Sequence, residues 1–182
     1  MKVSEVDIVS SNNVLRAGGV ILYPTEGVWG LGCDPWQRVP VQKILALKQR
    51  PMGKGLILLV ADLNQLNGLV RLTPEEQKRI LETTEVVTWV APASSAIPAW
   101  IRGDFTTVAF RVTKHEIARE ICRIGPIVST SANLSGDPAP CKLAEVAPEI
   151  IEKVDLVIHG ECGALRKPTP IYDLTQSCWL RR

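Results

Sequence analysis

The stretch PVQKILALKQRPMGKGLILLV (residues 40–60) joins a helical pattern to a strand pattern. Pro40 suits the first turn of a helix, and the apolar residues that follow it fall on one side. Pro51 ends this helix, because the residue before a proline avoids the α conformation. The apolar run LILLV at 56–60 has the length and composition of a buried strand. A helix that leads directly into a buried strand indicates an α/β fold.

The same alternation continues along the chain. Helical patterns cover 11–19, 73–81 and 113–125, and strand patterns cover 20–24, 86–92, 106–112, 126–130, 154–160, 170–174 and 178–182. Thr73 and Glu76 have the spacing of a capping box, and Thr113 with Glu116 repeats it ahead of an exit at Gly125. We therefore expect a single α/β domain over residues 1–182, built on a mixed sheet with helices.

Composition excludes several classes of protein. With 46% hydrophobic and 22% charged residues the chain is globular rather than disordered. Its net charge of +2 and sequence pI of about 8.3 fall short of a dedicated nucleic-acid-binding domain. The five cysteines never form a C-x-x-C pair, which argues against a disulfide framework or a zinc site. We expect a soluble, cytoplasmic protein with reduced thiols and no association with a membrane.

A basic segment lies between residues 34 and 62, with five cations and no carboxylate: Arg38, Lys43, Lys48, Arg50 and Lys54. Two unit charges about 8 Å apart repel by roughly 2 kcal/mol at an effective dielectric near 20. Convergence of the last three is therefore costly unless a polyanion such as a triphosphate shares the site. The alternative is a solvated basic helix end favoured by the helix dipole, which fits Lys43 and, less clearly, Lys48. Spacing alone does not separate the two.

Two other junctions carry polar side chains. The segment STSANLSG (129–136) can bind phosphate oxygens or an adenine edge, although taken alone it is more typical of a turn that caps its own backbone. Arg111 interrupts the apolar strand pattern TVAFRV, where it could bind a carboxylate or phosphate, or discourage edge pairing. Its apolar neighbours favour the first role. His115 and His159 have no partner at metal-ligand spacing, so no metal site is expected.

Together these junctions resemble a known family. YPTEGVWGLGCDP, LKQRPMGKGLILLV, VAFRV and STSANLSGDPAP occur in the order and spacing of the YrdC/TsaC family, the threonylcarbamoyl-adenylate (threonylcarbamoyl-AMP) synthases. The resemblance runs from about residue 15 to residue 182. Its most specific part is the K-x-R…S-x-N combination, here Lys48, Arg50, Ser131 and Asn133. We expect the short, single-domain form, without the additional C-terminal domain of longer members.

The resemblance implies a fold and a reaction. The fold is a twisted sheet with flanking helices around a deep basic cavity. The reaction is that of a nucleotidyltransferase, which joins L-threonine, bicarbonate or CO2, and ATP into threonylcarbamoyl-AMP and pyrophosphate. A threonylcarbamoyl-transferase complex then modifies an adenosine of ANN-decoding tRNAs, and weak direct contact with tRNA is left open. Mg²⁺ would arrive with ATP, and no protein-held metal is expected.

The resemblance also implies roles for individual residues. Lys48 and Arg50 are expected to be catalytic. The expected ATP-binding residues are Lys48, Arg50, Lys54, Ser131, Asn133 and Arg181. The expected L-threonine-binding residues are Thr25, Arg111, Ser131 and Thr169, with Arg111 on the substrate carboxylate. A turn written W-P-G-P-x-T in many relatives is TTEVVTW here and keeps only Thr88.

Three alternatives remain at this point. An RNA-binding module would show affinity that falls steeply with salt and needs no threonine, but aromatic residues are not interleaved with the cations. A relative that transfers carbamoyl groups in hydrogenase maturation would carry zinc-finger and acylphosphatase-like domains. A paralogue with the same fold could lack synthase activity, although the intact S-A-N sequence argues against this.

Overall fold

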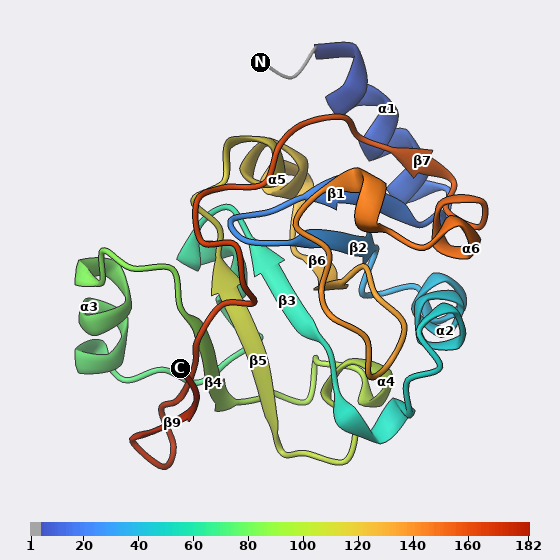
Figure 1. The fold of residues 1–182 in the computed structure, drawn as a ribbon. Coiled ribbons are helices and arrows are strands. Elements are labelled where there is room, and N and C mark those ends of the chain that lie inside the picture. Colours follow the sequence, from blue (N-terminus) through green and yellow to red (C-terminus); the bar gives the residue numbers. More distant parts are fainter. Residues whose placement is uncertain (1–4) are drawn as a thin grey trace.

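A computed structural model describes residues 5–182, so residues 1–4 of the predicted domain lie outside the described part. Within residues 5–182, nine strands form one mixed sheet in the order β7-β1-β2-β6-β3-β5-β4-β8-β9. The strands are β1 (Ile21–Pro24), β2 (Trp29–Cys33), β3 (Ile57–Val60), β4 (Thr88–Pro92), β5 (Thr107–Val112), β6 (Ile127–Ser131), β7 (Leu156–Val157), β8 (Ile171–Asp173) and β9 (Cys178–Arg181). Figure 1 shows this sheet with helices around it, which confirms the predicted α/β class.

The helices surround the sheet on both faces. They are α1 (Glu5–Arg16), α2 (Arg38–Leu47), α3 (Pro74–Glu82), α4 (Ala99–Arg102), α5 (Glu116–Ile121) and α6 (Pro148–Ile151), with short 3₁₀ turns η1 (Met52–Lys54), η2 (Leu63–Leu66), η3 (Cys122–Ile124) and η4 (Leu143–Glu145). Leu22 of β1 belongs to the larger apolar cluster with Ile44 of α2, whereas Tyr23 belongs to a second cluster with Ile117 of α5. Because neighbouring side chains of a strand point to opposite faces, β1 is buried on both sides.

Strand β2 escaped prediction because two of its five residues are glycine, which has a low strand propensity. Gly32 makes room for the ring of Tyr23 on the paired strand β1, because a Cβ atom there would lie 2.9 Å from Tyr23 Cε1. A Cβ atom on Gly30 would lie 3.2 Å from Thr25 Cγ2. The Tyr23 hydroxyl donates to Ser129 Oγ at 2.8 Å, so the ring reaches as far as strand β6.

One predicted helix start is confirmed and the other is wrong. At α3, Thr73 Oγ1 accepts from the Glu76 amide at 3.2 Å, and Glu76 Oε2 accepts from the Thr73 amide at 2.7 Å. At α5, the helix begins at Glu116 and Thr113 does not cap it. The Thr113 hydroxyl instead donates to the buried carboxylate of Glu26 at 2.6 Å, and its oxygen accepts from the His115 amide at 3.3 Å, ahead of the first helical residue. No helix in residues 5–182 is long and apolar enough to cross a membrane.

Candidate functional site

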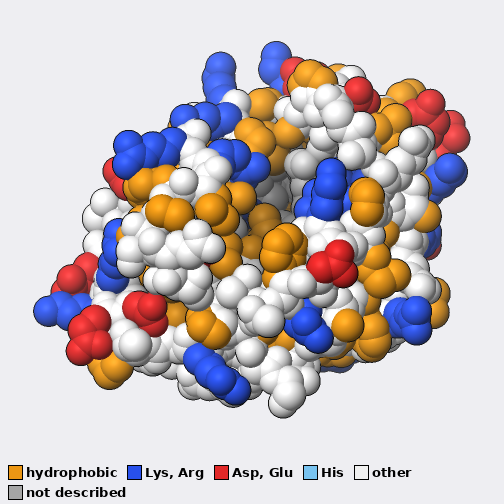
Figure 2. All heavy atoms as spheres, turned by 90° about the horizontal axis from the view of Figure 1, so that it is seen from below, with side chains coloured by type: hydrophobic (Ala, Val, Ile, Leu, Met, Phe, Trp, Pro, Cys, Tyr) orange, Lys and Arg blue, Asp and Glu red, His pale blue; other side chains and the backbone are white. Residues whose placement is uncertain are grey.

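A cavity of about 650 Å³ is lined by residues from seven neighbouring strands, from β2 to β9 in the sheet order, so the sheet curls around it. Figure 2 shows the molecule hollowed on this face, with Lys and Arg side chains around the opening. The cations that line the cavity are Arg50, Lys54, Arg102, Arg111, Lys167 and Arg181, against one lining carboxylate among the described residues, Asp173. This cavity therefore favours an anionic ligand.

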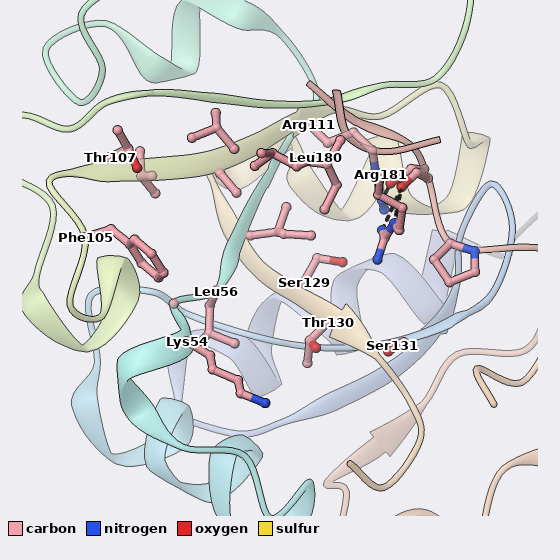
Figure 3. A pocket seen from close by; sticks show the side chains of 18 of the residues that line it. Lys54, Leu56, Phe105, Thr107, Arg111, Ser129, Thr130, Ser131, Leu180 and Arg181 are labelled. Atoms are coloured by element: carbon pink, nitrogen blue, oxygen red, sulfur yellow. Dashed lines mark hydrogen bonds between the residues drawn. The ribbon is translucent and has the colours of Figure 1, made fainter. Parts of the chain in front are cut away.

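The cavity brings together most of the residues that the sequence singled out. Seven of the nine predicted site residues line it: Thr25, Arg50, Lys54, Arg111, Ser131, Thr169 and Arg181. The other two, Lys48 and Asn133, lie directly behind Ser131 and contact each other. Figure 3 shows Lys54 and Ser131 on one side of the cavity and Arg111 and Arg181 on the other.

The end of helix α2 separates the two cations of the K-x-R motif. The Arg50 amide donates back to the Leu45 carbonyl at 2.9 Å, and Gln49 between the cations has a left-handed backbone with φ of 49°. This is the hydrogen-bond pattern of a Schellman-type helix end. It reverses the chain at Gln49, so Lys48 stays inside the fold while Arg50 lines the cavity.

Lys48 is 3% exposed, and its ammonium group donates hydrogen bonds to the S-x-N segment. Nζ donates to the backbone carbonyl oxygen of Ser131, and to the carbonyl oxygen and Oδ1 of Asn133 at 2.7 and 3.3 Å. An ammonium group has three donors, so all three have acceptors. Burial, followed by the charge of Arg50, lowers the pKa of Lys48 to about 8. The K-x-R and S-x-N motifs thus form one structural unit.

Arg50 is held by backbone while part of its guanidinium stays available. Its Nη2 donates to the carbonyl oxygens of Gly55 at 2.9 Å and Lys54 at 3.3 Å. Its Nε is buried and has no hydrogen-bond partner among the described residues. Burial lowers the pKa of Arg50 below its usual value. Arg50 nevertheless lines the cavity, so its charge acts on an anion bound there.

At the opposite end of the cavity, Arg111 is held from two sides. Its Nη1 donates to Thr169 Oγ1 at 3.0 Å, and its Nη2 lies 3.3 Å from Glu26 Oε2. Its Nε is buried without a partner among the described residues, as in Arg50. The Thr169 hydroxyl also lies 2.8 Å from that of Thr88, the residue retained from the altered turn.

Arg181 contacts the same residue as Arg111, Thr169. Its Nε and Nη2 both donate to the Thr169 carbonyl oxygen, at 3.1 and 2.6 Å. Burial, and then the charge of Arg111, lowers the pKa of Arg181. Two guanidinium groups from strands β5 and β9 therefore converge on one residue (Figure 3), an arrangement suited to an anionic ligand.

The sequence did not single out Glu26, which lies in YPTEG beside Thr25. Burial alone would raise the pKa of this carboxyl, but the charge of Arg111 and hydrogen bonds from the Thr113 hydroxyl and the Lys114 amide hold it below its usual value. The partner residues lie more than eighty positions away, at the end of β5. Its position directly after Thr25, a residue predicted to bind substrate, is the signal that could have identified Glu26.

Two cations of the basic segment, Arg38 and Lys43, do not line the cavity. Lys43 Nζ lies 2.8 Å from Asp155 Oδ2 on the surface, and the Arg38 guanidinium lies 6.0 Å from the centre of the Trp100 ring. Lys43 thus lies in the body of α2 and is paired with a carboxylate, rather than forming a solvated basic helix end. Residues 5–182 contain no group of three or more His, Cys, Asp or Glu side chains that could hold a metal ion.

Comparison with known proteins identifies the family. Residues 13–182 match the family model for Sua5, YciO and YrdC proteins, described as telomere recombination, so the chain belongs to this family. Threonylcarbamoyl-AMP synthase of Stenotrophomonas maltophilia is 44% identical over 183 residues, which cover 97% of this chain and 98% of the relative. The family resemblance expected from the four motifs is thereby confirmed.

Two solved structures share the fold. The Sua5 protein of P. abyssi, determined with L-threonine, superposes with a TM-score of 0.89 at 32% identity and covers 96% of this chain. This chain spans 53% of that protein, about half of its length. YciO of E. coli superposes with a TM-score of 0.86 at 26% identity, over 98% of this chain and 90% of that one.

Proposed function

We propose that this protein is an L-threonylcarbamoyladenylate synthase, an enzyme of the nucleotidyltransferase class. The synthase of S. maltophilia matches nearly the whole chain, and the P. abyssi relative was solved with L-threonine. The basic cavity is the observation that carries the proposal. It is lined by six cations and, among the described residues, by one carboxylate, Asp173.

The two ends of the cavity suit the two substrates. At one end Arg50 and Lys54 would bind the phosphates of ATP, with Ser131 beside them. At the other, Arg111 would bind the carboxylate of L-threonine, close to Thr25 and Thr169. Arg181, at the same end of the cavity as Arg111, would bind the nucleotide. Lys48 and Asn133 would shape the segment that presents Ser131.

The reaction needs alignment more than acid–base catalysis. The threonine amine and bicarbonate form an N-carboxy group with loss of water. A carboxylate oxygen of that group attacks the α-phosphorus of ATP, and the bond to pyrophosphate breaks. The protein would hold the reactants in line and stabilise the negative charge that develops on the phosphates. A cavity with guanidinium and ammonium groups, and without a Ser-His-Asp triad among its described lining residues, supports this mechanism.

Mg²⁺ would come with ATP, held by phosphate oxygens and water rather than by a protein cage. The chemistry of the cavity fits this arrangement, because Asp173 is its one lining carboxylate among the described residues. Asp173 Oδ1 already accepts from the amides of Thr175 and Gln176 and from the Thr175 hydroxyl.

The labile product would pass to a threonylcarbamoyl-transferase complex that modifies ANN-decoding tRNAs. We place the enzyme in the cytoplasm, where tRNA and ATP are available. Direct contact with tRNA remains a prediction. It would be tested by the salt dependence of tRNA binding, since neutralising phosphates with Lys and Arg makes affinity fall with salt.

The decisive experiment measures pyrophosphate release from ATP with threonine and bicarbonate each left out in turn. Release that requires both, with threonylcarbamoyl-AMP as the product, supports the proposal. Release without threonine, or none under any condition, contradicts it. Arg50→Ala should abolish release, whereas Arg123→Ala, at an exposed surface pair with Glu120, should leave it unchanged.

A further inference from the structure

Glu26 is a buried carboxylate that stands behind the cavity without lining it. It lies in the turn between β1 and β2, yet its partners lie at the end of β5, and β6 and β3 separate β2 from β5 in the sheet. Oε1 accepts from the Thr113 hydroxyl at 2.6 Å and from the Lys114 amide at 2.9 Å. Oε2 faces Arg111 Nη2 at 3.3 Å.

The two oxygens of the Glu26 carboxylate therefore have different partners. Oε1 is fixed by two donors from the segment that follows β5, which sets the direction of the whole carboxylate. Oε2 accepts no hydrogen bond from the described residues and interacts with Arg111 through the ion pair alone. A charged partner fixed in this way restricts the rotation of the guanidinium, whose planar fork needs a defined orientation to bind a carboxylate.

The remaining contacts of Arg111 complete this orientation. Arg111 Nη1 donates to Thr169 Oγ1, and Nη2 forms the ion pair with Glu26. Nε is buried without a partner among the described residues. Arg111 also lines the cavity. The ion pair and the Thr169 hydrogen bond thus fix the orientation of a guanidinium that lines the cavity.

We propose that Glu26 is a positioning residue that sets the affinity for L-threonine through Arg111. This inference rests on the proposed function and deepens it, because it assigns the amino-acid end of the cavity a residue that never touches the substrate. A buried carboxylate with a structural role alone would change the stability of the fold and affect both substrates alike. A positioning residue affects threonine selectively.

The test uses Glu26→Gln, which keeps the shape of the side chain and removes its charge. We expect the KM for threonine to rise roughly ten-fold or more, because a small misplacement of an orienting group is costly, while the KM for ATP stays within about two-fold. Glu82→Gln, the same change in an exposed pair with Lys78, should alter neither constant. An unchanged KM for threonine, or equal rises for both substrates, would overturn the inference.

A second variant covers the case in which Glu26→Gln does not fold. Thr113→Val removes one of the donors that fix Oε1 but leaves the ion pair charged. It should raise the KM for threonine in the same direction and by less. No change in a folded Thr113→Val protein would count against the inference.

Coupling between the residues gives an independent readout. If Glu26 acts through Arg111, Glu26→Gln should cause no further rise in an Arg111→Ala background, because residues that work as a unit are not additive. An equal rise in both backgrounds would overturn the inference. Wild-type release of pyrophosphate that does not depend on threonine would instead refute the proposed function, so the two failures are distinguishable.

Discussion

The ammonium nitrogen of Lys48 lies 2.7 Å from the backbone carbonyl oxygen of Asn133, 85 residues further along the chain. The contact joins the K-x-R motif after α2 to the S-x-N motif after β6. It is reinforced in the opposite direction, because the Ser135 amide donates to the Lys48 carbonyl oxygen at 3.0 Å. Lys48 therefore supports the wall of the cavity from behind.

Lys48→Met should destabilise the fold as well as the site. It removes the donor from the carbonyl oxygens of Ser131 and Asn133, and buried acceptors left without partners cost about 1–3 kcal/mol. Denaturant unfolding measures this change. Lys78→Met removes an exposed helical pair with Glu82 and should cost at most about 0.5 kcal/mol. A Lys48→Met protein of wild-type stability that has lost only ATP binding would instead indicate direct contact with phosphate.

The pKa of Lys48 predicts how stability depends on pH. Burial lowers the pKa to about 8, below the ordinary value of 10.5, so between these values the unfolded chain binds more protons than the folded protein. The free energy of unfolding that this group contributes therefore rises with pH across that window. Unfolding curves from pH 7 to pH 10.5 should show wild type gaining stability relative to Lys48→Met. Parallel pH dependences would contradict the assignment.

Gln49→Gly should be tolerated or mildly stabilising. Gln49 is exposed and has a φ of 49°, a conformation that costs side-chain-bearing residues about 1–2 kcal/mol and glycine little. We expect the free energy of unfolding to rise by about 0.5–1 kcal/mol. Gln42→Gly, in the body of the same helix, should lower it by about 1 kcal/mol. Equal losses at both positions would show that the helix does not end as described.

The two glycines of β2 should differ in their tolerance of a methyl group. In Gly32→Ala the new Cβ would lie 2.9 Å from Tyr23 Cε1 and 3.0 Å from the Val128 carbonyl oxygen, so we expect a loss of about 1–3 kcal/mol. In Gly30→Ala the nearest atom is Thr25 Cγ2 at 3.2 Å, so stability should fall less.

Because Thr25 is a predicted threonine-binding residue, Gly30→Ala should affect the KM for threonine more than it affects stability. Thermal unfolding and threonine titration of the two variants measure both effects. The reverse order, with Gly30→Ala the less stable protein, would contradict this account of how β1 and β2 pack.

Features set by neighbouring residues could be predicted from the sequence. The capping box of Thr73 and Glu76 depends on residues three apart, and the strands from β3 to β9 follow local apolar patterns. Strand β2 could not be predicted in this way, because Gly32 is explained by the Tyr23 ring of another strand and Gly30 by the nearby Thr25 side chain.

The candidate site was also predictable only in part, in its residue types but not in their contacts. The sequence motifs contained part of the cavity lining, such as Arg50 and Arg111, because their types and order reflect binding chemistry. The lining cations Arg102 and Lys167 lie outside these motifs. The partners of the motif residues depend on the sheet. Nothing local shows that Thr113 would donate to Glu26 rather than cap a helix, or that Lys48 would turn inward while Arg50 faces the cavity.

The order of the sheet also has a consequence for how the chain folds. Strand β6 lies between β2 and β3, pairing Ser131 with Gly30 and Ser129 with Ile57. During synthesis on the ribosome, β2 and β3 each have one edge without its native partner until β6 emerges. Such non-local pairing slows folding, and the waiting edges are where chaperones or wrong partners would bind.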